Sequence, residues 1–388
     1  MRHNLILPVL LIFVAGAVGS IAWSGNILAL PLSLAFPAAW AMSPNRTTVL
    51  VVSAAYFLAA SRGLPQGVAA FYGIDLWPGL LLWLVASVAF VFVHTALWTQ
   101  REGWEQPFRY LTAATLMAIP PFGILGWAHP LTAAGVLFPT LGWTGLAATA
   151  AGLAIMTTRH RPAAALAFGG FWLWSAANWT DPTLPTGWYG VDLHDGADLG
   201  RDNSLERYRD FSATLPEESR PAHEIVLLPE SSFGFWTPTL ERLWQRQLRE
   251  ADLTIVAGAS LVDDAGYDNV LVSITRDSSR ILYRERMPVP GSMWQPWRAW
   301  TGNSGGAHAY FFANPIVAVG DSSAAPLICY EQLLVWPVLQ SMLYDPDVIL
   351  AVGNGWWASE TSIVQIQKAS TQAWARLFNK PLVMAFNS

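Results

Sequence analysis

The sequence predicts a polytopic α-helical membrane bundle followed by an α/β domain, on the basis of two observations. The 388 residues are 53% hydrophobic and only 13% charged, whereas about a quarter of the residues in an ordinary soluble domain are charged. The charge is also unevenly distributed, because residues 1–180 carry very little of it and residues 192–290 carry most of it. We therefore expect a membrane domain over residues 1–180 and a water-facing domain over residues 181–388.

Long apolar runs in the first half set the expected membrane spans. A helix needs about 20 mostly apolar residues to cross the hydrocarbon core of a bilayer. About seven runs have this character, namely Leu5–Trp23, Asn26–Met42, Thr47–Ala60, Leu76–Trp98, Tyr110–Trp127, Leu131–Met156 and Pro162–Trp179. The first run is too long for the apolar core of a signal peptide and further runs follow it directly, so we interpret it as a retained helix.

Arginines between the runs predict the orientation of the bundle. If the N-terminus is cytoplasmic, six arginines lie on the inner side and only Arg62 lies outside, as the positive-inside rule requires. The six are Arg2, Arg46, Arg101, Arg109, Arg159 and Arg161. Seven crossings then place the second domain outside. In a Gram-negative bacterial cell, this predicts a multi-pass inner-membrane protein with a cytoplasmic N-terminus and a periplasmic C-terminal domain.

From about Trp188 onward, short β-like runs alternate with helical ones, which predicts a layered α/β domain. The expected strands are Val191–Leu193, Glu224–Pro229, Leu253–Ala259, Asn269–Thr275, Arg280–Arg284, Tyr310–Val319, Pro326–Cys329, Val348–Val352 and Leu382–Phe386. The expected helices are Leu205–Ala213, Thr239–Glu250, Gln332–Leu343 and Ser359–Phe378. Loops at strand ends carry most of the chemistry in such domains, so a site is expected there.

Two strand ends carry residues suited to nucleophilic chemistry. Glu230 directly follows an apolar strand, where burial raises the pKa of a carboxyl group and suits it to act as a general base. Cys329 is the only cysteine, and Tyr330 and Glu331 follow it. A lone cysteine among aliphatic residues is also typical of an inert core position, so the cysteine alone does not decide between the two interpretations.

A third strand end completes a pattern that resembles a known family. The segment Val352–Trp357 has glycines that permit a tight turn and ends in two tryptophans. Leu-Pro-Glu, Leu-Ile-Cys-Tyr-Glu and Asn-Gly-Trp-Trp, in that order after an apolar bundle, resemble the carbon–nitrogen hydrolase (nitrilase) superfamily. More narrowly, the chain is similar to the apolipoprotein N-acyltransferase branch and to plasmid-encoded conjugal transfer members of the wider group. This resemblance implies a polytopic bundle and a periplasmic αββα sandwich.

The resemblance implies a site that performs Cys-dependent acyl transfer or amide chemistry. Glu230 takes the place of the general base, and Cys329 takes the place of the nucleophile that forms a thioester. Tyr330 and Glu331 take the places of residues that shape and polarise the site. The residues expected to line the pocket are Trp294, Asn354 and Trp357.

One position departs from the family pattern. The family has a catalytic lysine in a segment Tyr-x-Lys-x-x-x-Val-Pro, and the matching segment Tyr283–Pro290 has Glu285 at that position. The lysine stabilises an oxyanion, and loss of such a donor typically lowers a rate by about a hundred- to a thousand-fold. Arg284 and Arg286 are the nearest substitutes, although neighbouring residues of a strand point to opposite faces.

The family pattern also continues with further strands and a final membrane helix beyond Ser388, so the resemblance implies an altered end with a sheet edge to be covered. A net charge of −5 without a basic stripe argues against direct binding of nucleic acid. No cofactor is implied, and the seven histidines show no spacing typical of metal ligands.

Three functions remain open from the sequence. The chain is an accessory membrane protein of plasmid conjugation with some thiol chemistry, an active lipoprotein N-acyltransferase, or a non-catalytic membrane scaffold with a degenerate pocket. The expected partners are a membrane lipid, a lipoprotein or the conjugation machinery. Glu285 favours the first and third functions, whereas Glu230, Cys329 and Glu331 favour an enzyme.

Overall fold

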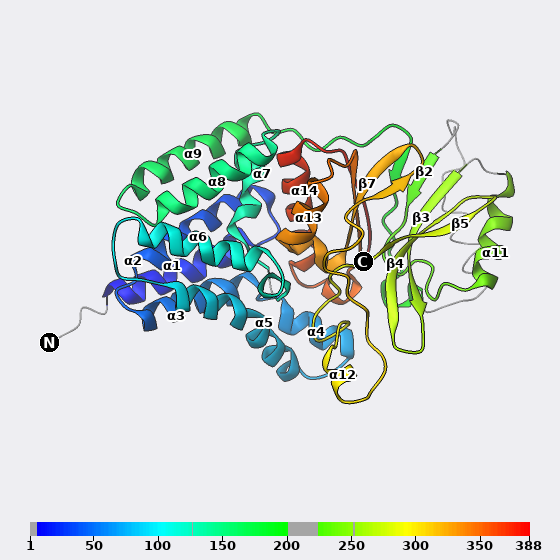
Figure 1. The fold of residues 1–388 in the computed structure, drawn as a ribbon, viewed down its shortest axis with the longest axis horizontal. Coiled ribbons are helices and arrows are strands. Elements are labelled where there is room, and N and C mark those ends of the chain that lie inside the picture. The colour runs from blue at the N-terminus through cyan, green and yellow to red at the C-terminus, as the bar shows by residue number, and fades with distance from the viewer. Residues whose placement is uncertain (1–5, 126, 201–223, 251–252) are drawn as a thin grey trace. The chain divides into compact units, whose positions relative to one another are not determined.

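The computed structural model describes residues 6–125, 127–200, 224–250 and 253–388 (Figure 1). The chain divides into two compact units. The first consists of Met1–Pro182, Leu333–Trp336 and Glu360–Lys380, and the second consists of Thr183–Gln332, Pro337–Ser359 and Pro381–Ser388. The helix expected at Leu205–Ala213 lies outside the described residues.

The first unit is helical. Its helices are α1 (Ile6–Ala22), α2 (Phe36–Met42), α3 (Arg46–Ala60), α4 (Leu64–Tyr72), α5 (Leu76–Leu97), α6 (Glu105–Ala118), α7 (Ala134–Leu137), α8 (Gly142–Met156), α9 (Arg161–Ala177) and α14 (Ile363–Phe378), with 3₁₀ segments η1 (Ile27–Ala35), η2 (Phe122–Ile124) and η3 (Pro130–Ala133). Helix α14 comes from the second half of the sequence but packs on α7. Their backbones approach so closely that a Cβ at Gly135 would lie 1.6 Å from the carbonyl oxygen of Ala373.

The lengths of the helices in the first unit bear on the expected membrane spans. Among the described residues, α5 alone is long and apolar enough to cross a bilayer, and the bent pair α3 and α4 adds a second candidate if it is one span. The seven expected crossings are therefore not confirmed. Proline explains several of the shorter helices, because it has no N–H to donate and clashes with the preceding turn. Pro120 and Pro121 follow the end of α6, and Pro139 lies in the break between α7 and α8.

The described part of the second unit contains two β-sheets. The first has the order β1 (Trp188–Gly190), β2 (Glu224–Leu227), β3 (Leu253–Val262), β4 (Tyr267–Ile274) and β5 (Ser279–Arg284), with β1, β2 and β3 parallel and β3, β4 and β5 antiparallel. The second has the order β6 (Val317–Val319), β7 (Ser322–Ile328), β8 (Val348–Asn354) and β9 (Leu382–Asn387), with β7, β8 and β9 parallel. The expected strand Tyr310–Val319 is reduced to β6. The expected strand Val191–Leu193 is replaced by β1, and Leu193 forms an isolated bridge to Asn387.

The sheets pack on each other through aliphatic side chains. Leu227, Val256 and Leu271 of the first sheet share one buried core with Ile328 and Leu350 of the second. On the other face of the first sheet lies α11 (Pro238–Gln247), which continues as η5 (Leu248–Glu250). Its apolar side chains Leu240 and Trp244 join a second core there. An α/β domain of stacked layers is therefore present, as the alternating pattern predicts.

The remaining short elements connect these layers. They are η4 (Gly196–Asp198), α12 (Trp297–Trp300), η6 (Cys329–Leu333), α13 (Val335–Met342) and η7 (Trp356–Ala358). The turns after β2, β5, β7 and β8 hold the residues of the candidate site.

Candidate functional site

Glu230 lies in a tight turn just after β2. The turn is held against β3 by a hydrogen bond from the Leu228 N–H to the Val256 carbonyl at 2.8 Å. A Cβ at Gly258 of β3 would lie 2.5 Å from the Glu230 Cα, so this close approach requires glycine. Glu230 is 6% exposed. The turn therefore holds a carboxyl group inside the domain rather than in solvent.

Cys329 is the first residue of η6, directly after the end of β7. The sequence placed it as the last residue of the strand, and the structure moves it into the turn. Its φ angle is 44°, in the left-handed region that non-glycine residues rarely adopt. Such a conformation costs about 1–3 kcal/mol and persists only where the surroundings enforce it. The strain is thus concentrated at the residue that carries the thiol.

The structure brings Glu230 and Cys329 into contact. The thiol of Cys329 donates a hydrogen bond to the Glu230 carboxylate. The Asn269 side-chain amide donates to Glu230 Oε1 at 2.8 Å, and the Asn354 backbone N–H donates to Oε2 at 3.1 Å. Strand ends of both sheets, β2 and β7, therefore meet at one carboxyl group, which β4 and β8 hold in place.

Burial raises the pKa of Glu230, and the hydrogen bonds from Asn269, Cys329 and Asn354 oppose the rise. The charge on Glu331 adds to the rise. A carboxylate with a raised pKa is a stronger base than an exposed one, and it already holds the thiol proton in a hydrogen bond. The arrangement can therefore pass a proton from sulfur to carboxylate without moving either side chain far.

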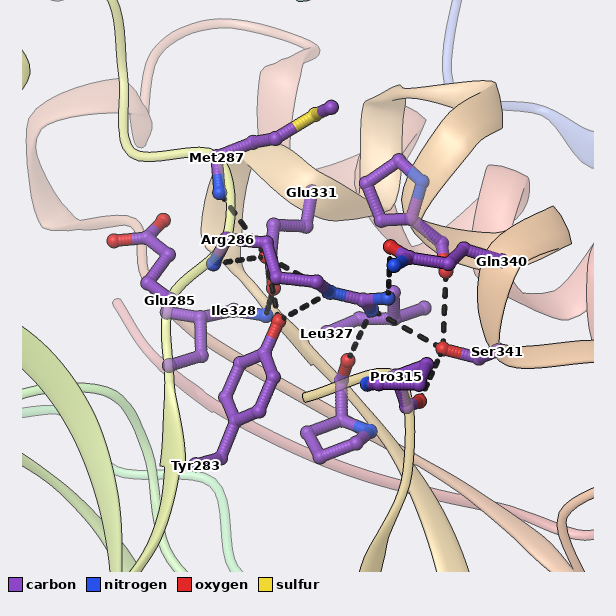
Figure 2. Close-up of polar contacts among 12 residues, drawn as sticks. Tyr283, Glu285, Arg286, Met287, Pro315, Leu327, Ile328, Glu331, Gln340 and Ser341 are labelled. Atoms are coloured by element: carbon purple, nitrogen blue, oxygen red, sulfur yellow. Dashed lines mark hydrogen bonds and ion pairs between the residues drawn. The ribbon is translucent and has the colours of Figure 1, made fainter. Parts of the chain in front are cut away.

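Glu331 lies two residues beyond the cysteine and has a different environment (Figure 2). Its Oε1 accepts hydrogen bonds from the Tyr283 hydroxyl at 2.6 Å and from the backbone N–H groups of Arg286 and Met287 at 2.8 and 3.3 Å. Its Oε2 accepts from the Ile328 N–H at 2.8 Å. Burial raises the pKa of Glu331, whereas Arg286 and these donors oppose the rise. Glu331 thus fixes the backbone on both sides of the site and, in this structure, acts as a positioning residue.

Arg286 is fully buried and is the counter-charge of Glu331, with its Nε 3.7 Å from Glu331 Oε1. Its Nε also donates to the Tyr283 hydroxyl at 2.8 Å. The other nitrogens donate to Gln340 Oε1, Ser341 Oγ and the Pro326 carbonyl at 3.0–3.3 Å. Figure 2 shows the guanidinium enclosed by these acceptors.

The two arginines considered as substitutes for the missing lysine are paired with acidic groups other than Glu230. Arg286 is held by Glu331 and its neighbours, and Arg284 is paired with Asp268 of β4. The physical reason is the alternation of side chains along the chain, which sends the neighbours of Glu285 away from it. The structure thus gives both arginines other partners.

Glu285 itself lies on the side of Glu230. Its backbone N–H donates to the Asn269 carbonyl at 2.8 Å, and its Oε2 accepts from the Asn269 side-chain amide at 2.8 Å. Glu285 is 1% exposed, and its Oε1 has no hydrogen-bond partner among the described residues. Burial raises the pKa of Glu285 well above its ordinary value, and the negative charges of Glu331 and Glu230 raise it further.

The other expected residues lie as follows. Asn354 contributes its backbone N–H to Glu230, and its side-chain oxygen accepts from Asn387 at 2.8 Å. The Trp357 indole donates to the Asn354 carbonyl at 3.0 Å. Tyr330 is buried in the turn after Cys329. Trp294 packs edge-on against Phe311 at 5.2 Å between ring centroids.

Sequence reasoning missed Asn269, which joins Glu230 to Glu285, and the partners of Arg286 on α13. Asn269 is a buried amide inside a strand of otherwise mostly apolar residues, and a polar residue in that setting was a usable signal. Within the described ranges, no group of three or more His, Cys, Asp or Glu residues could hold a metal ion.

Comparisons with known proteins identify the family of the chain. Residues 58–376 match the family model of carbon-nitrogen hydrolase. The chain belongs to the carbon-nitrogen hydrolase family. It is 60% identical over its full length to a probable conjugal transfer protein TraB of Sinorhizobium fredii, all of which it covers. It is 59% identical to the conjugal transfer protein TraB of Agrobacterium fabrum, over 98% of this chain and 92% of that protein.

Solved structures of this family are more distant. An amidase from a Nesterenkonia species is 14% identical, with a TM-score of 0.36, over 52% of this chain and 74% of that one. A CN-hydrolase superfamily protein of Xanthomonas campestris is 16% identical, with a TM-score of 0.32, over 54% and 77% of the two chains.

Proposed function

We propose that this member of the carbon-nitrogen hydrolase family supports plasmid conjugative transfer from the bacterial inner membrane and forms a thioester at Cys329. The role in conjugation is supported by two relatives of about 60% identity that are named conjugal transfer protein TraB. The chemistry is supported by one observation above all, the hydrogen bond from the Cys329 thiol to the Glu230 carboxylate.

The membrane location is part of this proposal. Several helices of the first unit expose large apolar side chains, such as Phe13 of α1 (73% exposed), Phe92 of α5 (66%) and Leu166 of α9 (78%). Exposed apolar surface of this kind is unfavourable in water and favourable in contact with lipid chains. Together with the positions of the arginines, it supports a multi-pass domain over residues 1–180 with a cytoplasmic N-terminus and a periplasmic C-terminal domain.

The proposed reaction uses one base and one nucleophile. Glu230 takes the thiol proton, and the Cys329 sulfur attacks the carbonyl carbon of an amide or ester. The leaving amine or alcohol then takes the proton from Glu230 as the bond to it breaks, which leaves an acyl thioester on Cys329. An acceptor amine or water next attacks the thioester and gives its proton to Glu230, and that proton returns to sulfur.

The experiment measures the acyl-enzyme directly. Full-length protein in detergent is incubated with amide and ester acyl donors, and the intact mass and thioester are followed by mass spectrometry. Because the chain has a single cysteine, we expect one acyl group, which disappears in Cys329→Ser. Replacement of the base by Glu230→Gln should slow acylation by about a hundred- to ten-thousand-fold. Failure of every donor class to acylate Cys329 would remove the chemical half of the proposal.

Mating assays test the other half. A deletion strain should transfer its plasmid at reduced frequency, and the native gene should restore the frequency. A non-catalytic scaffold is the second candidate, because Glu285 and not a cation is bonded to the Asn269 amide beside Glu230. The scaffold predicts that Cys329→Ala and Glu230→Gln complement as well as the native gene. Our proposal predicts that both variants fail to complement although their protein levels are normal.

A further inference from the structure

Two buried carboxyl groups share one amide beside the thiol. The Asn269 Nδ2 donates to Glu230 Oε1 and to Glu285 Oε2, both at 2.8 Å. An amide nitrogen has two hydrogens, so each carboxyl group receives one. The two groups differ in their remaining contacts, because Glu230 also receives the Asn354 N–H and the Cys329 thiol, whereas Glu285 Oε1 receives nothing from the described residues.

The surrounding charges do not favour ionisation of Glu285. The charged groups of other elements that act on Glu285 are Glu230, which follows β2, and Glu331, which follows β7, and both are acidic. Its chain neighbours are cations, but Arg286 is held by Glu331, and Arg284 is held by Asp268, which also accepts from the Tyr310 hydroxyl at 2.8 Å. A buried carboxylate with a single donor and no paired cation is strongly disfavoured.

We propose that Glu230, Asn269 and Glu285 work as one unit that holds a single negative charge, with the proton kept on Glu285. This proposal rests on the proposed thiol chemistry and assigns Glu285 as a positioning residue. The neutral Glu285 leaves Glu230 as the ionised member, and Asn269 fixes the distance between them. When Glu230 takes the thiol proton, both carboxyl groups are neutral, and the only new charge is on sulfur. Ionised Glu285 would place a second negative charge beside that sulfur.

The unit also selects the substrate by charge. Glu331 and Arg286 balance each other, so the group of Glu230, Glu285 and Cys329 carries one net negative charge before and after the proton moves. An acyl donor that is neutral or positive near its carbonyl group is therefore accepted, and one with a carboxylate or phosphate at that place is repelled.

Infrared spectroscopy tests where the proton lies. The carbonyl band of a protonated carboxylic acid is recorded for the full-length protein in detergent at pH 7 and compared with the same band in Glu285→Gln. We expect the native protein to show a buried acid band that Glu285→Gln lacks, whereas Glu102→Gln, at an exposed glutamate of the first unit, keeps it. An unchanged band in Glu285→Gln would show that Glu285 is ionised and would overturn the proposal.

A pair of alkylating reagents of similar shape tests the charge at the thiol. Neutral iodoacetamide and anionic iodoacetate both label a thiolate, and the chain has one cysteine to label. If Glu285 is neutral, Glu285→Gln should leave the ratio of the two rates at pH 7 within about twofold of native, whereas Glu285→Lys should shift it toward iodoacetate by on the order of tenfold or more. A shift of that size in Glu285→Gln as well would contradict the proposal.

These readouts separate the two proposals. If no acyl donor labels Cys329 but the infrared band depends on Glu285, the assignment of the proton to Glu285 stands and the thioester function fails. If the acyl thioester forms but the band is absent, the function stands and the assignment of Glu285 fails.

Discussion

Glu285 and Arg286 are adjacent in the chain, yet their side chains point to opposite sides of the backbone (Figure 2) and bond to two different sets of polar groups. On one side, Arg286 and Glu331 are both fully buried, and each is paired with the other and accepts or donates further hydrogen bonds. On the other side, Glu230 and Glu285 are both acidic and share one amide. The first cluster is typical of a group built for rigidity, and the second of a group built to exchange a proton.

The difference shows how a fold can hold several carboxyl groups near one thiol. A buried charge is tolerated when a counter-charge and hydrogen bonds replace water, as they do for Glu331. Glu230 lacks a counter-charge but receives three hydrogen bonds, whereas Glu285 receives one and stays neutral in our proposal. Of the three carboxyl groups, only Glu230 bonds the thiol and lacks a paired cation, so it is the one that can act as a base.

The largest expected effect comes from disrupting the cluster of Arg286 and Glu331, which we call the balanced cluster because its two charges offset each other. Arg286→Met removes the cation, leaves Glu331 buried without its counter-charge, and should lower the free energy of unfolding by about 3–5 kcal/mol. Thermal unfolding of the full-length protein in detergent measures this. As a matched control, Arg276→Met breaks a surface ion pair with Asp277 and should change stability by at most about 1 kcal/mol. Equal effects in the two variants would show that the buried cluster is not the rigid part of the site.

The second substitution, Glu285→Gln, should raise the stability of the protein instead of lowering it. The pKa of Glu285 is raised above its ordinary value of 4.5, so the folded chain binds this proton more tightly than the unfolded chain does. Its contribution to stability is complete below the ordinary pKa and is lost as the pH rises toward the raised one. Glu285→Gln should therefore stabilise the protein, relative to native, by about 1.4 kcal/mol for each pH unit in that window.

The measurement is the difference in unfolding temperature between Glu285→Gln and the native protein, recorded at pH 5, 6, 7 and 8. The difference should grow with pH. A difference that is the same at all four values would mean that glutamine packs better but that Glu285 has an ordinary pKa, and the contrast between the two clusters would then weaken.

Sequence patterns located the parts of the site that lie at strand ends. Glu230 and Cys329 could be found because an apolar run that stops at a polar residue marks where a buried strand reaches a loop. The same reasoning gave the alternation that separates Glu285 from Arg286, but not which of the two faces Glu230. That choice depends on the register of β5 beside β4, which places the Glu285 N–H against the Asn269 carbonyl.

Other features depend on contacts that are remote in sequence. Asn269 looked like the start of a strand, and its two acceptors come from turns 39 and 16 residues away. In the first unit, average hydropathy ignores proline, so Leu131–Met156 was expected to be one helix and is instead divided between η3, α7 and α8. The packing of α14 on α7 follows from the close approach at Gly135, which no local pattern shows.

The smallest effect sharpens the description of the balanced cluster. The Tyr283 hydroxyl donates to Glu331 and accepts from the Arg286 Nε, so it bridges the two charges. Tyr283→Phe removes that bridge but keeps the ring and the ion pair, and it should lower the free energy of unfolding by about 1.5–3 kcal/mol, the range for hydrogen bonds to charged groups. Acylation of Cys329 should keep its pH dependence, because the bridge does not touch Glu230. A changed pH profile in Tyr283→Phe would mean that the two clusters titrate together and that the backbone between Glu285 and Arg286 does not separate them.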